Sequence, residues 1–378
     1  MRILVLHDPY LPVTLGAVGG EDNLAKLEIE TLSKRGHEVI DGRFMDSGIG
    51  KKLNQLRAQT IGSNPGVIEK IRATNPDVIH THNLNQRSGY LWMSQNDIPV
   101  VSSLHNYRLF CPSSIAYRSG HHCLECRDQG AIKAIQHSCD GIRGTLNASR
   151  HLIFQRANPQ INIPAMFLIS SNLMERVLDP IIPKSKFRLL RNPGTIPTQL
   201  TSRKEFRNGW IFAGRLIEEK GILDLIMNWP ESEKLDIAGD GPLRKAISEL
   251  IAQKSNIQLI GTYPPGENNI FTKYEGLIFP SKWFEGSPLV TMECLATGTP
   301  IICTDQSGAS EQVAETKGGV VISGALSRNK LAESQAEIRA NFDFYSQNAI
   351  AAISEEFSVD TWARKLEGYL QEALELSS

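Results

Sequence analysis

Short apolar runs alternate with segments of helical period along nearly the whole chain, and this alternation constrains the fold more than any other feature. The runs at residues 3–6, 78–79, 100–104 and 166–169 are almost continuously apolar. Strands in parallel sheets have this pattern because helices cover both of their faces. Segments of helical period, such as 23–36, lie between the runs, so the pattern predicts repeated strand–helix–strand units.

A second series of the same kind begins after a segment rich in proline. Residues 191–197 have no apolar period, and further apolar runs follow at 210–213, 235–238 and 276–279. The length of 378 residues fits two domains at about 150 residues each. The predicted fold class is α/β with two Rossmann-like βαβ domains. The predicted boundaries are 1–192 for the first domain, 193–356 for the second and 357–378 for a final helix.

Charge and hydropathy exclude several classes of protein. Lys and Arg number 40 and Asp and Glu 41, a balance that argues against a nucleic-acid binder. No stretch approaches the roughly 18 apolar residues of a membrane span. The first apolar run stops at His7 and Asp8, short of the core of a signal peptide. We therefore expect a cytoplasmic protein, which a lipid-linked substrate would bring to the inner membrane face.

Residues 284–294 follow a predicted strand and form the strongest candidate site. Ser287 suits the N-cap position of a helix and Pro288 its first position. Free amides at such a helix N-terminus would suit a diphosphate. The amides that would meet there are those of Gly286, Ser287, Leu289 and Val290. Glu285 precedes the helix and Glu293 lies one to two turns into it; an ordinary capped helix is the competing interpretation.

Two cations follow the run at 210–213. Arg215 and Lys220 are five residues apart, before the next predicted helix. Ligands of open α/β sheets bind outside the carboxyl ends of the strands, so these side chains could neutralise phosphates. Two solvated loop cations are the competing interpretation.

Histidines and a glycine pair mark strand ends in the first domain. His80 and His82 are interpreted as structural, because a lone histidine at a strand end usually is. His105 is the better functional candidate, since it opens a long irregular region. Gly19 and Gly20 precede a helix without the G-x-G-x-x-G pattern, so the dinucleotide fingerprint is absent.

Taken together, these features resemble a retaining glycosyltransferase of the GT-B fold, and they are most similar to glycosyltransferase family 4. The resemblance covers nearly the whole chain. It is carried by Gly19-Gly20, the strand at 77–82, His105-Asn106, the segment 214–221, Gly239-Asp240-Gly241-Pro242 and the Glu-x₇-Glu signature from Glu285 to Glu293. It implies two domains facing a cleft and a final helix that crosses back to the N-terminal domain.

The resemblance also implies how a nucleotide-sugar donor binds. Arg215 and Lys220 would hold the diphosphate together with the amides from Gly286 to Val290. Glu293 would bind the ribose hydroxyls. No divalent metal or other cofactor is expected, because the two cations take over its charge-neutralising role.

Roles at the reacting centre follow from the same resemblance. Glu285 would orient the transferred sugar, His105 would lie against the sugar, and Gly20 would approach the donor from the facing domain. We favour front-face transfer with retention, because the N-terminal domain offers no obvious carboxylate nucleophile. The resemblance implies a glycan or lipid-linked acceptor and a role in polysaccharide or glycolipid biosynthesis.

Four of the six cysteines lie in the irregular region at 106–145. The text from His105 to Pro112, His-Asn-Tyr-Arg-Leu-Phe-Cys-Pro, resembles a subset of these enzymes. Structural zinc, free thiols and disulfides stay open, although a cytosolic compartment disfavours disulfides. The four cysteines are Cys111, Cys123, Cys126 and Cys139.

Three rival classes share parts of this pattern. A nucleotide-sugar epimerase could have a similar two-domain fold and would turn over the donor without an acceptor. A non-catalytic nucleotide-sugar-binding protein is the second rival. A nicotinamide dehydrogenase is disfavoured by the missing glycine fingerprint. The sequence leaves the base and sugar of the donor, the acceptor and the oligomeric state open.

Overall fold

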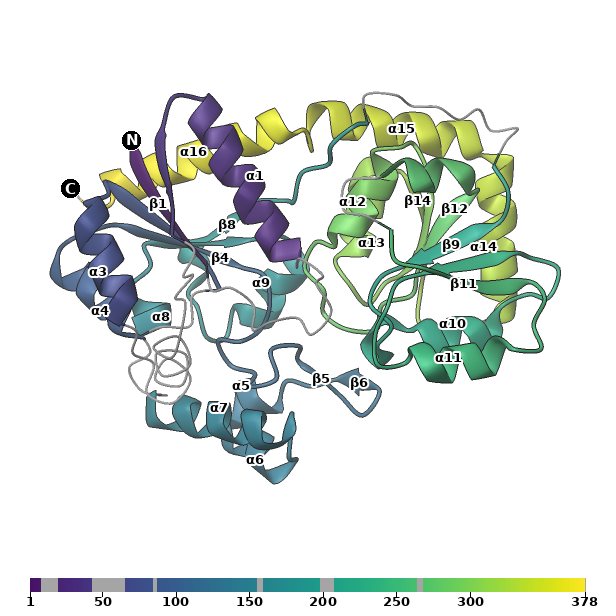
Figure 1. The fold of residues 1–378 in the computed structure, drawn as a ribbon, viewed down its shortest axis with the longest axis horizontal. Coiled ribbons are helices and arrows are strands. Elements are labelled where there is room, and N and C mark those ends of the chain that lie inside the picture. The colour runs from purple at the N-terminus through teal and green to yellow at the C-terminus, as the bar shows by residue number, and fades with distance from the viewer. Residues whose placement is uncertain are drawn as a thin grey trace. The chain divides into compact units, whose positions relative to one another are not determined.

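Two parallel sheets of six strands each organise the chain (Figure 1), which confirms the predicted α/β class. The computed structural model describes residues 1–7, 20–42, 65–83, 87–154, 159–197, 207–263 and 268–377. The chain divides into two compact units. Unit 1 comprises Met1–Arg118, Cys123–Leu190 and Ala363–Ser378, and unit 2 comprises Ser119–His122 and Arg191–Trp362.

The sheet of unit 1 has the strand order β2-β1-β3-β4-β7-β8. Its strands are β1 (Arg2–His7), β2 (Glu38–Asp41), β3 (Val78–His82), β4 (Val100–Leu104), β7 (Met166–Ile169) and β8 (Phe187–Leu189). The helices of this part are α1 (Gly20–Lys34), α3 (Pro65–Thr74), α4 (Arg87–Gln95), α8 (Pro159–Asn162) and α9 (Asn172–Leu178). The chain runs from β1 to one side and returns to β3 on the other, so strand order reverses between them, and such points favour ligand binding.

The region predicted as irregular, residues 106–145, contains short elements. They are β5 (Tyr117–Arg118), β6 (His121–His122), α5 (Glu125–Gln129) and α6 (Ile132–Gln136), and α7 (Gly141–Phe154) follows. Buried Ala131, Ala134 and Ala148 form a small apolar cluster against which Cys126 and Cys139 pack. The absence of a clean apolar period therefore reflects the shortness of these elements.

The sheet of unit 2 has the strand order β11-β10-β9-β12-β13-β14. Its strands are β9 (Trp210–Ala213), β10 (Leu235–Ala238), β11 (Ile257–Gly261), β12 (Gly276–Phe279), β13 (Ile301–Thr304) and β14 (Gly319–Ile322). The helices are α10 (Ile222–Asn228), α11 (Arg244–Ile251), α12 (Leu289–Leu295), α13 (Ala309–Thr316), α14 (Arg328–Ala340) and α15 (Phe342–Glu355). This order is that of a Rossmann fold, in which strand order reverses between β9 and β12.

Burial on both faces explains why these strands are continuously apolar. Ile211 and Ala213 of β9 pack in one core with residues of α12, α13 and α15. Trp210 and Phe212 pack in a second core with residues of α10, α11 and α14. Because successive side chains point to opposite faces, helices on both sides require an apolar residue at every position.

The last helix, α16 (Val359–Glu375), begins in unit 2 and continues into unit 1, as the fold prediction requires. Leu366 and Leu370 are fully buried. Glu367 accepts hydrogen bonds from Arg35, and Arg188 forms an ion pair with Glu372. No helix in the part of the chain that the structure describes is long and apolar enough to cross a membrane.

Candidate functional site

The candidate residues of unit 2 lie at the carboxyl edge of its sheet, on both sides of the point where strand order reverses. Arg215 follows β9, and Glu285 follows β12, the strand beside it. Open α/β sheets bind their ligands at this place. The sequence predicted that these two segments bind one ligand. The sheet order explains how they can do so, because β9 and β12 are neighbouring strands.

Lys220 and Glu285 form a close ion pair. The ammonium group donates to both carboxylate oxygens, at 2.6 and 2.7 Å. The same carboxylate accepts hydrogen bonds from the Ser281 hydroxyl and the Trp283 indole, each at 3.2 Å. The ammonium also lies 5.3 Å from the ring centroid of Phe279 and 5.8 Å from that of Trp283. Four contacts on one side chain fix the position of Glu285.

Arg215 differs from Lys220. Its side chain is exposed, and within the described ranges it has no ion-pair partner. Lys220 therefore has a built-in counter-charge, whereas the charge of Arg215 is fully available to an anion.

Two glycines allow the loops of this site to pack at backbone distance. Gly221 has φ +73°, and a Cβ there would lie 2.1 Å from the Pro280 carbonyl oxygen. A Cβ on Gly308 would lie 1.5 Å from the carbonyl oxygen of Gly286. The Gly308 amide donates to the Glu285 carbonyl at 2.6 Å. A side chain at Gly221 would displace Pro280 at the end of β12, and one at Gly308 would displace the backbone at Glu285 and Gly286.

The predicted start of the helix after Glu285 is wrong by one position. Helix α12 begins at Leu289, and Pro288 is its N-cap with an extended backbone (ψ 132°). No side chain caps the helix, and the Ser287 hydroxyl instead accepts a hydrogen bond from the Gln312 amide at 2.8 Å. The Ser287 carbonyl accepts another from Asn192 at 2.6 Å. Of the predicted amide donors, only those of Leu289 and Val290 belong to the first helical turn.

Glu293 lies inside α12 and is half-buried. Burial raises the pKa of its carboxyl group, and a hydrogen bond from the Tyr263 hydroxyl at 3.2 Å acts in the opposite direction. A buried carboxylate with few partners can accept hydrogen bonds from hydroxyl groups of a ligand.

The N-terminal candidates lie in unit 1. His105 follows β4 and is half-buried, and its ring contacts His82. The structure thus connects the functional candidate with residues that the sequence suggested were only structural. Gly20 is the exposed first residue of α1, and Gly19 lies outside the described residues. Sequence reasoning missed Glu28, the acidic residue of α1 that contacts both strand histidines.

All six cysteines are free thiols in the structure. Burial, followed by the neighbouring thiol of Cys111, raises the pKa of Cys126 to about 12. Cys139 has its pKa raised by the same two causes. Within the described residues, the only group of three potential metal ligands within 4.8 Å of one another is Glu28, His80 and His82, and structural zinc at the four cysteines stays a prediction.

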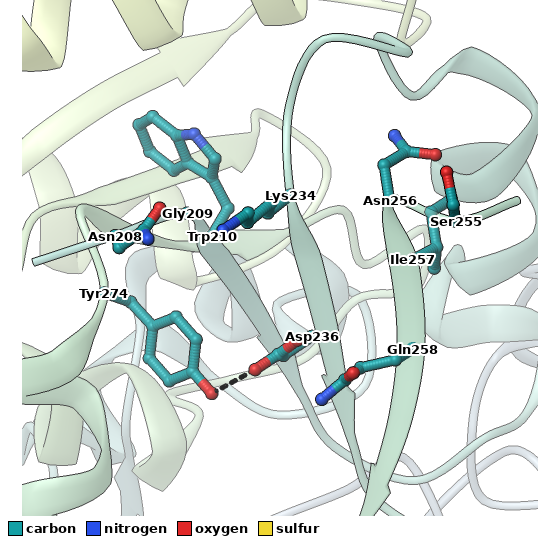
Figure 2. Close-up of a pocket in the computed structure, with 10 residues that line it drawn as sticks. All are labelled: Asn208, Gly209, Trp210, Lys234, Asp236, Ser255, Asn256, Ile257, Gln258 and Tyr274. Carbon is teal, nitrogen blue, oxygen red and sulfur yellow. Dashed lines mark hydrogen bonds between the residues drawn. The ribbon is translucent and has the colours of Figure 1, made fainter.

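One cavity lies away from all of these residues. It has a volume of about 340 Å³ and opens at the amino-terminal edge of β9, β10 and β11 (Figure 2). Polar groups such as Lys234 and Asn256 line it, and Tyr274 donates a hydrogen bond to Asp236 at 2.6 Å. No predicted site residue lines this cavity.

Comparisons with known proteins agree with this architecture. Residues 201–346 match the model of the family "Glycosyl transferases group 1". A putative teichuronic acid biosynthesis glycosyltransferase, TuaC of Bacillus subtilis, is 34% identical over 103 residues, which are 26% of this chain and 25% of that protein. An uncharacterised 42.6 kDa protein of the cps region of Klebsiella pneumoniae is 23% identical over 248 residues, or 64% of this chain and 60% of that protein. The chain thus spans a quarter to three fifths of these relatives.

Solved structures show the same fold over the whole chain. Sucrose-phosphate synthase from Thermosynechococcus elongatus matches with a TM-score of 0.71 and 18% identity, covering all of both chains. Anabaena HepE in complex with UDP matches with a TM-score of 0.68 and 15% identity over 98% of this chain and 100% of that one. The fold is therefore that of the GT-B glycosyltransferases.

Proposed function

We propose that this protein is a retaining glycosyltransferase, similar to family 4, that transfers a sugar from a nucleotide-diphosphate sugar to a glycan or lipid-linked acceptor. The observation that carries the proposal is the contact between Lys220 and Glu285 at the reversal point of unit 2. Both residues belong to the motifs that suggested the activity, and both lie within the segment that matches the glycosyltransferase family model.

The cations of the site fit the charge that the reaction develops. When the bond between sugar and diphosphate breaks, negative charge accumulates on the leaving phosphate. Fixed positive groups at that place lower the barrier, because they are oriented before the reaction begins. In the proposed complex, Arg215 contacts the diphosphate as a free cation and Lys220 shares its ammonium group between the phosphate and Glu285. We infer that no divalent metal is required.

The two glutamates would divide the rest of the donor between them. Glu285 is held by Lys220 and by two neutral donors, so its remaining lone pairs can orient hydroxyl groups of the transferred sugar. Glu293 would accept hydrogen bonds from the ribose. These bonds would stabilise the ionised form of a carboxyl group whose pKa burial has raised.

We infer retention of the anomeric configuration by front-face transfer. Glu285 is fixed by an ion pair and Glu28 is fully buried, so neither is presented as a free nucleophile. In this mechanism the leaving phosphate takes the proton of the acceptor hydroxyl. NMR spectroscopy of the product would test the inference, since an inverted anomeric centre contradicts it.

The setting of the reaction follows from the relatives. The TuaC protein is named for teichuronic acid biosynthesis. We therefore propose polysaccharide or glycolipid assembly as the role of this chain. We also propose a cytoplasmic location, with peripheral contact with the membrane when the acceptor is lipid-linked.

Release of nucleotide from a panel of sugar donors, with and without acceptors, tests the proposed activity. The protein should release nucleoside diphosphate only from its own donor, and faster with an acceptor. Conversion of the donor without release of nucleotide would instead show an epimerase. Binding without turnover would show a non-catalytic protein.

Lys220→Met links the activity to this site. Loss of one preorganised charged donor should lower kcat/KM by about 10²–10³-fold. Lys245→Met is the matched control, because that side chain is 91% exposed and, in the part of the chain that the structure describes, pairs only with Glu249 on the helix surface. Equal activity of both variants would contradict the site assignment.

A further inference from the structure

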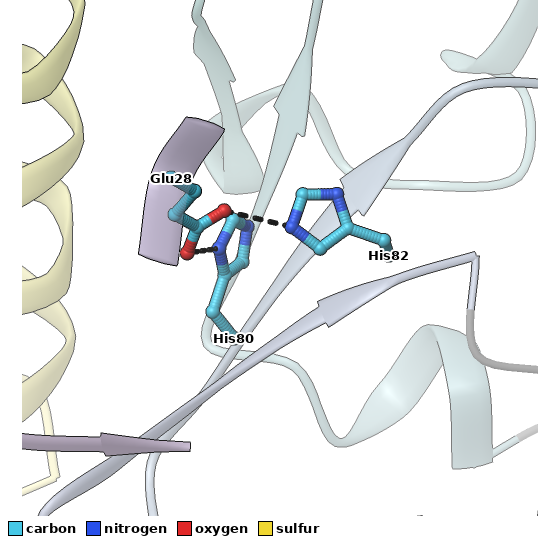
Figure 3. Close-up of side chains that lie close together, drawn as sticks. All are labelled: Glu28, His80 and His82. Atoms are coloured by element: carbon cyan, nitrogen blue, oxygen red, sulfur yellow. Dashed lines mark hydrogen bonds and ion pairs between the residues drawn. The ribbon is translucent and has the colours of Figure 1, made fainter. Parts of the chain in front are cut away.

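Three side chains of unit 1 meet in a buried cluster that the donor site does not use (Figure 3). His80 and His82 are two residues apart on β3, so both rings lie on the same face of the sheet. Helix α1 places Glu28 over that face. Nδ1 of His80 lies 2.6 Å from one carboxylate oxygen, and Nε2 of His82 lies 2.8 Å from the other.

The cluster holds a charge in the interior. The side chain of Glu28 is fully buried and those of His80 and His82 are 1% exposed. Burial alone would raise the pKa of Glu28, but the two imidazoles outweigh it and lower the pKa to about 2. An ionised carboxylate only accepts hydrogen bonds, so each imidazole must donate an N–H to it.

This requirement fixes the direction of the next hydrogen bond. When neutral His82 carries its proton on Nε2, its Nδ1 is an acceptor. Nδ1 of His82 lies 2.9 Å from Nε2 of His105, and the two rings are stacked with 5.1 Å between their centroids. His105 must therefore donate through Nε2. Its own Nδ1 is then unprotonated, and it has no hydrogen-bond partner among the residues that the structure describes.

The rest of the network agrees with these proton positions. Nε2 of His80 lies 2.8 Å from the Ser103 hydroxyl, which can donate to it. The backbone amide of His105 donates to the Asn83 side chain at 3.0 Å, and this bond fixes the backbone position from which the His105 ring extends. Every ring nitrogen of the two strand histidines thus has a partner.

Protons explain these contacts better than a metal ion does. The ligand atoms of Glu28, His80 and His82 all lie within 4.8 Å of one another, a spacing that a metal could also use. However, each nitrogen lies at hydrogen-bond distance from its own oxygen. Zinc ligands would instead converge on one shared point about 2.0–2.2 Å from each of them.

We propose that Glu28 and His82 are positioning residues that hold His105 as a neutral ring with Nδ1 as a hydrogen-bond acceptor for a hydroxyl group of the substrate. His105 follows β4 at the carboxyl edge of the sheet, beside the reversal point between β1 and β3, where ligands bind. A sugar or an acceptor alcohol has the hydroxyl that this nitrogen would accept. This role rests on the proposed glycosyltransferase function, whereas the proton positions do not.

Burial is the main influence that keeps His105 neutral. Burial lowers its pKa well below the ordinary value, and any positive charge on His82 or His80 of β3 would lower it further. Glu28 on α1 acts in the opposite direction but is the weakest of these influences.

The tautomer of His105 can be measured on the whole protein by NMR with ¹⁵N-labelled histidine at pH 8. The His105 signals are assigned by their absence in His105→Asn. We expect an unprotonated Nδ1 and a protonated Nε2. A protonated Nδ1, or an equivalent of bound metal that elemental analysis finds in the unmodified protein and not in Glu28→Gln, would overturn the proposal. Neither measurement needs catalytic turnover. A protein with the expected tautomer but no glycosyltransferase activity would therefore contradict the proposed function and leave the proton positions standing.

Two variants test whether the hydrogen bonds from Glu28 through His82 set the proton position on His105. His82→Phe keeps an aromatic ring but removes the acceptor, so His105 should show both tautomers. Ser103→Ala is the matched control, because it changes the same network at His80 and leaves the bond between His82 and His105 intact. An unchanged single tautomer in His82→Phe would show that Glu28 and His82 do not set the proton position. If His82→Phe does not fold, the measurement on the unmodified protein still decides.

Discussion

Each unit places one glutamate among positive or proton-donating groups near the reversal point of its sheet, but the two glutamates differ in access to solvent. Glu28 of unit 1 is completely buried, and both of its oxygens bind histidines. Glu285 of unit 2 is 15% exposed and its partner Lys220 is 11% exposed. A sealed carboxylate can set proton positions, whereas one that reaches solvent can share its partner with a ligand.

This difference in exposure predicts that the two glutamates contribute differently to stability and to activity. Removing the partners of a buried charge destabilises a protein far more than removing the partners of a charge that water can reach. We therefore expect substitutions at Glu28 to act mainly on folding and on the state of His105, and substitutions at Glu285 to act mainly on donor use.

The largest expected effect on stability is that of Glu28→Leu. The change leaves the N–H groups of two buried imidazoles without acceptors, and breaking a buried pair in this way costs about 3–5 kcal/mol. The free energy of unfolding from urea titrations measures it. Glu30→Leu is the control on the same helix, because that side chain is 52% exposed and lies near Lys26. A loss below about 1 kcal/mol in Glu28→Leu would contradict the buried hydrogen bonds of Glu28 with His80 and His82.

Acid should remove the contribution of Glu28. The folded state lowers the pKa of Glu28 from 4.5 to about 2, so the stabilisation is complete above pH 4.5 and disappears as the pH falls toward 2. The shift corresponds to about 3 kcal/mol at about 1.4 kcal/mol per pKa unit. Unfolding titrations of the unmodified protein and of Glu28→Gln from pH 6 to pH 3 should therefore approach each other, with about 1.4 kcal/mol of the difference left at pH 3, one unit above the folded pKa. A constant difference between the two curves would show that the carboxylate is not the responsible group.

The smallest effect should be that of Glu285→Gln on stability. Glutamine keeps an oxygen for the Lys220 ammonium and the site reaches solvent, so we expect a loss of about 1–2 kcal/mol. Glu28→Gln is the same chemical change at the buried position and should cost more at pH 7. If Glu285→Gln costs as much as Glu28→Gln, the two glutamates do not differ in the way that their exposure indicates.

The strands could be predicted closely because the signal is local. The runs at 100–104, 166–169, 210–213 and 276–279 coincide with β4, β7, β9 and β12. Helix α14 was not predicted, since polar Ser334 and Gln335 lie on its buried side and interrupt the apolar stripe. The cap of α12 was misplaced by one position, since Pro288 is the N-cap and the Ser287 hydroxyl contacts Gln312 of the next helix.

The sequence by itself determined two parallel α/β domains and named the cations and glutamates of the proposed donor site, because apolar runs, glycines and charged loop residues act through their near neighbours in the chain. Only the tertiary structure decided which of these groups touch. Lys220 and Glu285 are 65 positions apart, and Glu28 is 52 positions from His80. In the sequence Glu28 is one acidic residue in a charged helix. Docking of α1 on β3 removes it from water and makes its two histidine partners necessary.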